Sequence, residues 1–145
     1  MRRTICLIIL LFSFISCSKD AKVIRRISGQ WEIVKYSQTD ASSITKPMDA
    51  SGTFNFDKYK QSDVSGSYYY EYQFGDTYQS MIKSSGFYHS NYKDEALYLK
   101  PIETDSLSLL TFQKFHIDIL TSTDAILEFN DLEFIHRFVL KKKTT

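Results

Sequence analysis

The sequence predicts an all-β protein, an antiparallel meander of about eight strands that closes into a barrel. Three observations support this prediction. Apolar and polar residues alternate with a period of two through most of the chain after residue 28, which is typical of half-buried antiparallel strands. Turn-forming residues separate these runs at short intervals. Aromatic residues, which favour strands, make up 15% of the chain.

The expected strands follow one another with short connections. Their apolar centres are residues 31–36, 54–56, 68–74, 97–99, 107–109, 115–119, 127–129 and 132–140. In the first strand, strict alternation places Trp31, Ile33 and Lys35 on one face and Tyr36 on the other. Turns are expected at Ser51-Gly52, Ser65-Gly66, Gly75-Asp76, Ser85-Gly86, 121–124 and Asn130-Asp131.

Three further expectations concern the connections and the absence of helices. Pro47 and Pro101 should fall between strands, because proline cannot donate a ladder hydrogen bond. The longest connection, residues 37–51, is polar, and we interpret it as a flexible flap near the mouth of the barrel. After the N-terminal apolar run, no segment has helical spacing long enough to predict a helix.

The N-terminus has a different pattern. Arg2 and Arg3 precede an apolar run over residues 5–15, and a serine then precedes Cys17. The run is too short to span a bilayer. This pattern resembles the signal segment of bacterial lipoproteins. The resemblance implies that residues 1–16 are a cleaved signal peptide and that Cys17 is the lipidation site.

The same resemblance implies a domain organisation and a location. Residues 17–27 would be a polar linker to the lipid, and residues 28–145 would be the barrel domain. The lipid on Cys17 would make the membrane a partner and hold the protein in the bacterial cell envelope, at the periplasmic face of the outer membrane or at the cell surface. Ser18, directly after the cysteine, argues against retention in the inner membrane.

Composition excludes several classes of function. Without residues 1–16, the chain carries 16 basic and 17 acidic residues, and a nucleic-acid binder would need a basic excess. Cys6 belongs to the signal and Cys17 to the lipid, so no thiol remains for a disulfide, a nucleophile or a thiolate metal site. His89, His116 and His136 do not have metal-ligand spacing. No nucleophile elbow or phosphate-binding glycine loop occurs. We therefore expect no enzyme activity, no metal and no cofactor.

Residues 27–34, with Gly29 followed two residues later by Trp31, resemble the opening of lipocalin-like domains. The hairpin expected over residues 115–129 is similar to a later strand pair of lipocalin-like envelope lipoproteins, and Arg137 loosely matches the arginine of their last strand. The resemblance implies a lipocalin-like barrel in which Trp31 plugs one end. Burial of a large indole at the start of a strand is favourable on physical grounds as well.

The candidate binding residues lie on inward faces of the expected strands. Tyr68, Tyr70 and Tyr72 share one face, and His136 shares another with Phe134 and Phe138. Tyrosine has an apolar body and a polar tip, which suits a cavity for a small apolar or amphiphilic ligand. The alternative is a non-enzymatic interaction or structural lipoprotein, with a filled barrel that docks a protein or glycan partner in the envelope through outward tyrosines such as Tyr69 and Tyr98.

Overall fold

The computed structural model describes residues 19–59, 64–75, 81–104 and 112–144. The proposed signal peptide and Cys17 lie outside these residues, as does the strand expected at 107–109. The described strands are β1 (Gly29–Thr39), β2 (Thr45–Met48), β3 (Ala50–Lys58), β4 (Ser65–Phe74), β5 (Ile82–Asn91), β6 (Ala96–Thr104), β7 (Gln113–Leu120), β8 (Asp124–Asn130) and β9 (Ile135–Lys142), with a 3-10 turn, η1 (Tyr92–Asp94).

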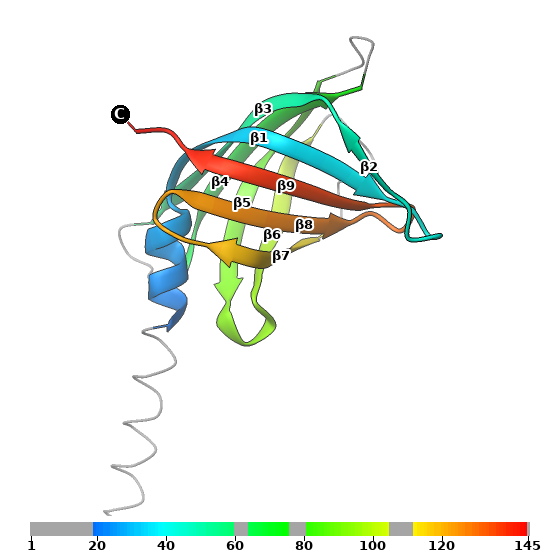
Figure 1. The fold of residues 1–145 in the computed structure, drawn as a ribbon. Coiled ribbons are helices and arrows are strands. Elements are labelled where there is room, and N and C mark those ends of the chain that lie inside the picture. The colour runs from blue at the N-terminus through cyan, green and yellow to red at the C-terminus, as the bar shows by residue number, and fades with distance from the viewer. Residues whose placement is uncertain (1–18, 60–63, 76–80, 105–111, 145) are drawn as a thin grey trace, which may run out of the picture.

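These strands form one antiparallel sheet that closes on itself. Its order is β2-β1-β3-β4-β5-β6-β7-β8-β9, and β1 also pairs with β9. Strand β1 and the seven strands from β3 through β9 thus form a closed barrel of eight strands. β2 is an extra strand beside the end of β1 (Figure 1). Closure leaves few unpaired strand edges. The predicted meander barrel is confirmed.

The connection expected as a flexible flap is instead a β-hairpin. β1 continues to Thr39 and pairs with β2 through Thr39 and Thr45, whose hydroxyls lie 2.9 Å apart. Pro47 therefore lies inside a strand, contrary to the prediction. It is tolerated because β2 pairs on one side only, with β1, so a missing N–H on its free side breaks no ladder bond.

β5 is also absent from the strands that the sequence predicts, because Ser85-Gly86 suggests a turn. The pair lies inside β5 at a register shift against β6, and Gly86 is opposite Pro101. Pro101 therefore also lies within a strand, at an irregularity where proline is accepted. Ser84, Gly86 and Ser90 face inward. Their small side chains leave room inside the barrel for the large aromatics of β4.

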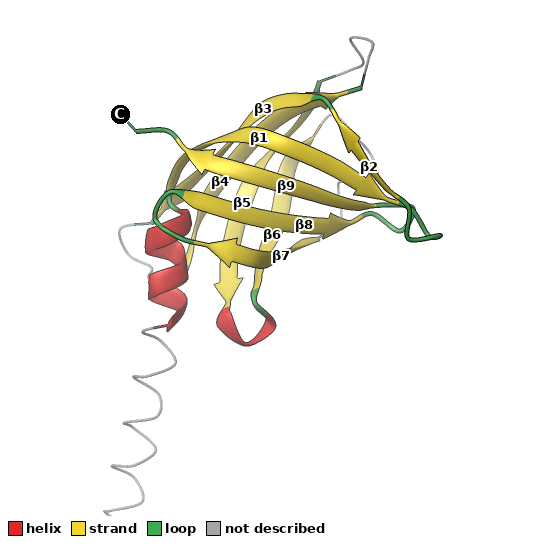
Figure 2. Cartoon of the chain, in the orientation of Figure 1, coloured by secondary structure: helices red, strands yellow, loops and turns green. Residues whose placement is uncertain are grey.

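Residues 19–27 form a short helix that covers one end of the barrel (Figure 2). The sequence predicts a polar linker here, because nine helical residues give too little periodicity to recognise. Ile24 and Ile27 are completely buried against the barrel, and they are three residues apart on one helix face. No helix in the described part of the chain is long and apolar enough to cross a membrane.

Trp31 is completely buried at this end of the barrel, as predicted. Its indole Nε1–H donates to the carbonyl oxygen of Ile27 at 2.6 Å, so the plug is bonded to the helix. Lys142 Nζ lies 5.1 Å from the centre of the ring and donates to the carbonyl oxygen of Arg26 at 2.9 Å. Beyond the plug, aromatic rings fill the middle of the barrel, among them Phe54, Phe56, Tyr70, Phe115 and Phe138.

Candidate functional site

The end of the barrel opposite the helix, here called the mouth, is where β1 ends and β9 begins. The β1–β2 and β8–β9 turns lie together there, at the right of Figure 1. Two buried polar side chains lie near the starts of strands β7 and β9, at this end of the barrel. Gln113 and His136 are 1% and 5% exposed, whereas the helix end is lined by Trp31, Ile24 and Ile27. A buried polar group needs a partner, so the bonds at the mouth show what remains available to a ligand.

An irregularity in β1 turns Tyr36 into the barrel. The register between β1 and β9 shifts between Ile33 and Lys35, so Val34 and Lys35 both face outward and Tyr36 is only 3% exposed. Strict alternation predicts that Tyr36 lies on the face opposite Trp31, and the burial of both residues shows that this prediction is wrong. A bulge reverses the faces of all residues that follow it, and nothing in the residue types around Val34 marks it.

Tyr36 joins a chain of hydrogen bonds. Its hydroxyl oxygen lies 2.7 Å from His136 Nδ1, and His136 Nε2 lies 2.7 Å from Asp131 Oδ2. Gln38 donates to the Tyr36 hydroxyl oxygen at 2.9 Å, and the phenolic proton is still available for a bond to Nδ1. In the tautomer that carries its proton on Nε2, the ring accepts at Nδ1 and donates a hydrogen bond to Asp131.

The protonation states of Tyr36 and Asp131 follow from the surroundings of each group. Burial raises the pKa of Tyr36 far above its usual value, despite the bond from Gln38. Burial by itself would raise the pKa of Asp131 as well. That effect is outweighed by bonds from the Phe134 N–H and the His136 ring, so the pKa of Asp131 lies below its usual value. Tyr36 is therefore a neutral hydroxyl and Asp131 a carboxylate at neutral pH.

The four predicted ligand contacts, Tyr68, Tyr70, Tyr72 and His136, all lie inside the barrel and are at most 5% exposed. The Tyr68 hydroxyl lies 3.0 Å from Ser84 Oγ, and the Tyr70 hydroxyl donates to Gln113 Oε1 at 3.0 Å. Burial raises the pKa of Tyr70 to about 12. Both hydroxyls are thus satisfied by the protein itself. The role of these four residues as ligand contacts stays a prediction.

Tyr72 differs from its neighbours on β4. Its ring packs against those of Tyr36, Phe74 and Phe138, with centroids 6.4, 5.9 and 5.2 Å away. Within the described part of the chain, its hydroxyl makes no hydrogen bond and is not among the fully enclosed polar atoms. Burial raises its pKa far above the usual value. Tyr72 therefore offers a neutral donor and acceptor beside the Tyr36–His136 pair.

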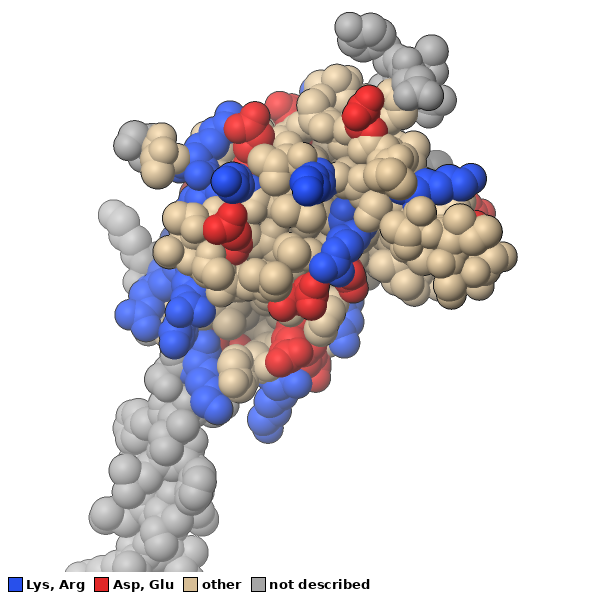
Figure 3. Space-filling view, in the orientation of Figure 1, with Lys and Arg blue, Asp and Glu red and all other residues tan. Residues whose placement is uncertain are grey.

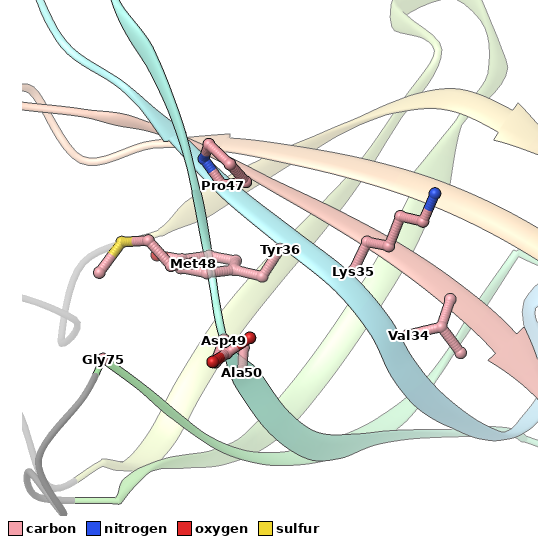
Figure 4. Close-up of a pocket in the computed structure, with 8 residues that line it drawn as sticks. All are labelled: Val34, Lys35, Tyr36, Pro47, Met48, Asp49, Ala50 and Gly75. Carbon is pink, nitrogen blue, oxygen red and sulfur yellow. The ribbon is translucent and has the colours of Figure 1, made fainter.

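A hollow of about 560 Å³ lies beside this cluster. It lies where β1 changes partner, since pairing with β3 ends at Glu32–Thr53 and pairing with β2 starts at Tyr36–Met48. Its lining comprises Val34, Lys35, Tyr36, Pro47, Met48, Asp49, Ala50 and Gly75. In Figure 4 the Tyr36 ring extends toward Met48, whereas Val34 and Lys35 point away from it. Tyr36 thus belongs to both the hollow and the hydrogen-bonded chain.

The remaining candidates lie elsewhere. The Tyr69 hydroxyl donates to Glu71 at 2.6 Å, and the Tyr98 hydroxyl donates to Asp94 at 2.6 Å. The His89 ring stacks on Tyr98 with centroids 5.1 Å apart. The outward tyrosines of the docking alternative are therefore already engaged with neighbours. Over the described ranges, no three His, Cys, Asp or Glu side chains are placed to hold a metal ion.

Comparison with known proteins supports the fold. No protein-family model matches the sequence, and no curated protein is similar to it. Among solved structures, a redesigned β-barrel has a TM-score of 0.56 and 11% identity, covering 84% of this chain and 96% of the other. A de novo designed fluorescence-activating β-barrel has a TM-score of 0.55 and 8% identity, with coverages of 83% and 97%. A redesigned β-barrel bound to DFHBI has a TM-score of 0.51 and 14% identity, with coverages of 80% and 98%. At these identities the similarity establishes a shared barrel fold.

Proposed function

We propose that this protein is a non-enzymatic binding lipoprotein that takes a small amphiphilic molecule at the mouth of its barrel. The observation that carries the proposal is the hydroxyl of Tyr72, which makes no hydrogen bond within the described residues and lies beside the Tyr36–His136 pair. The polar head of the ligand would bond to this hydroxyl. Its apolar part would lie against the Tyr36 ring and Met48 in the adjoining hollow.

The size of the hollow fits a small ligand. A volume of about 560 Å³ falls within the roughly 300–1,000 Å³ of small-molecule sites. Aromatic side chains fill the middle of the barrel, so the ligand would occupy the mouth and not the full length. Barrels of the same fold support this kind of use, since one of them is described as bound to DFHBI.

Binding is favoured over catalysis by the state of the phenol. Tyr36, His136 and Asp131 are connected like a nucleophile, a base and an orienting carboxylate. A nucleophile is activated by a lowered pKa, yet burial raises the pKa of Tyr36. Because Tyr36, His136 and Asp131 are bonded to one another, they can instead present a rigid polar surface to the polar head of a ligand.

Tyr72→Phe tests the ligand site. The probes are DFHBI and a dansyl-labelled fatty acid, titrated by fluorescence into the purified protein. Removal of one hydrogen bond of about 0.5–1.5 kcal/mol should weaken the binding of at least one probe by roughly 2- to 10-fold. Tyr68→Phe is the matched control, because that hydroxyl is already bonded to Ser84. The ligand site is wrong if the parent binds neither probe, or if both variants bind like the parent.

Attachment to the outer membrane through Cys17 is the second part of the proposal, supported by the signal-like N-terminus. Cys17→Ala should move the protein from the detergent phase to the aqueous phase in a Triton X-114 partition. Several acyl chains give stable attachment at about 0.8 kcal/mol per buried methylene, and the variant would lack them. If parent and variant partition equally, and the signal peptide is removed from both, the proposed lipid anchor at Cys17 is wrong.

A further inference from the structure

A second hollow, of about 400 Å³, lies at the opposite end of the barrel from the mouth. It separates the helix of residues 19–27 from the ends of β5, β6 and β7. The helix contributes three cations to its wall, Lys19, Lys22 and Arg26. An apolar floor is formed by Val23, Ala96, Ile117 and Leu120. We call this hollow the basic groove.

The helix that forms the basic wall is firmly attached to the barrel. Asp20 Oδ1 accepts from the Tyr92 N–H at 2.7 Å and from the Ser90 hydroxyl at 3.1 Å. The same face of the helix buries Ile24 and Ile27 in the core. The groove is therefore a preformed feature of the fold, and binding there would not require the helix to be ordered first.

The charges in the groove leave a positive excess. Lys19 Nζ lies 4.6 Å from the centre of the Tyr92 ring, and Arg26 Nη1 donates to the Leu120 carbonyl oxygen at 3.2 Å. Two carboxylates, Glu95 and Asp118, also line the hollow. The Asp118 carboxylate is bonded to Arg137 at 2.5 Å. The three cations thus face one carboxylate that has no cationic partner in the described part of the chain.

We propose that the basic groove binds the phosphate headgroup of an anionic phospholipid in a membrane. Lysine and arginine bind phosphate, and the apolar floor suits the first methylenes of an acyl chain. Tyr92, 44% exposed at the rim, is a residue type enriched at membrane interfaces. Figure 3 shows Lys and Arg gathered around the helix, at the lower left of the molecule.

The position of the groove in the chain supports a membrane lipid over other anions. Lys19 is only two residues after Cys17. A lipid on Cys17 would therefore bring this end of the barrel to the headgroups, where each nearby basic residue contributes about 1 kcal/mol with anionic lipid. Such docking would turn the mouth away from the bilayer. This lipid site is separate from the proposed ligand site, so either proposal can fail without the other.

The test is native mass spectrometry of the full chain in detergent, with dioleoyl phosphatidylglycerol or dioleoyl phosphatidylcholine added. The parent should retain phosphatidylglycerol with at least a 5-fold lower Kd than phosphatidylcholine. Lys22→Glu combined with Arg26→Glu should abolish this preference. Lys22→Glu alone should reduce it, and Lys22 provides a second variant because it makes no hydrogen bond or ion pair within the described residues. Lys46→Glu with Lys100→Glu, a matched charge change at two exposed positions away from the helix, should retain it.

Three outcomes would overturn the proposal. The first is equal retention of the two lipids by the parent. The second is loss of the preference in the Lys46 and Lys100 control to the same extent as in the groove variants, which would indicate a net-charge effect. The third is full competition by glycerol 3-phosphate at an equal concentration, which would make the groove a site for a soluble phosphate and not for a membrane lipid.

Discussion

The hydroxyl of Tyr36 lies 2.7 Å from Nδ1 of His136, and the bond joins two residues that are 100 positions apart in the chain. β1 and β9 are the first and last strands of the barrel, so this bond lies across the seam where the sheet closes. The seam at the mouth is therefore held by a side-chain bond in addition to the ladder, and both partners face the interior.

Tyr36→Phe should lower the free energy of unfolding by about 1–3 kcal/mol, because it leaves His136 Nδ1 buried without a partner. Urea denaturation followed by circular dichroism measures the change. Tyr92→Phe removes a hydroxyl from a 44% exposed side chain and should change the stability by less than about 0.5 kcal/mol. Similar values for the two variants would show that the seam bond does not contribute to stability.

Asp131 should make the stability depend on acid pH. Its pKa is lower in the folded protein than in the unfolded chain, so its contribution is present above the unfolded value of about 3.9 and is lost as the pH falls through the folded value. Asp131→Asn removes this titration. The difference in unfolding free energy between parent and Asp131→Asn should therefore be largest at neutral pH and should shrink below about pH 4. A constant difference from pH 7 to pH 2.5 would contradict this assignment.

Trp31→Ala should destabilise the barrel by about 3–5 kcal/mol, because it empties the plug and removes the bond to the Ile27 carbonyl. Circular dichroism is the appropriate probe in urea, since Trp31 is the single tryptophan of the chain. Val34→Ala, on the same strand but 47% exposed, is the control and should cost less than about 1 kcal/mol. A cost below about 1 kcal/mol at Trp31 would show that the plug is dispensable.

Gly86→Ala should be more harmful than Gly75→Ala. A Cβ at Gly86 would lie 2.1 Å from the Lys100 carbonyl oxygen on the paired strand, so β5 and β6 would have to separate and the cost should exceed about 2 kcal/mol. At Gly75 nothing lies within 4 Å, but φ is +98°, and a left-handed backbone costs an alanine about 1–2 kcal/mol. Thermal unfolding of the two variants measures the difference. A lower Tm for Gly75→Ala than for Gly86→Ala would contradict the close approach of β5 and β6.

Part of the site could be predicted from the sequence alone. Alternation on β4 placed Tyr68, Tyr70 and Tyr72 on one face, and all three lie inside the barrel. The same reasoning placed His136 with Phe138 and predicted that Trp31 is buried. These predictions succeeded because a regular strand alternates its side chains strictly, so that residue types alone identify the inward face.

Other features depend on contacts between distant segments. The bulge that turns Tyr36 inward belongs to the pairing of β1 with β9, and the first strand by itself carries no sign of it. The helix of residues 19–27 has too few turns for a recognisable period and is stabilised by packing Ile24 and Ile27 onto the barrel. Gly86 and Pro101 suggest breaks when each is considered alone, yet they lie opposite one another in a continuous ladder.

The sequence by itself therefore determined the fold class, the approximate number of strands and the inward faces of the regular strands, because these follow from local periodicity. Tertiary structure decided which of the inward-facing hydroxyls on β4 are hydrogen-bonded. Tyr68 and Tyr70 find partners on β5 and β7, whereas Tyr72 finds none among the described residues. Hydrogen bonds between side chains depend on the register and closure of the whole barrel, and these are set only when distant strands pair.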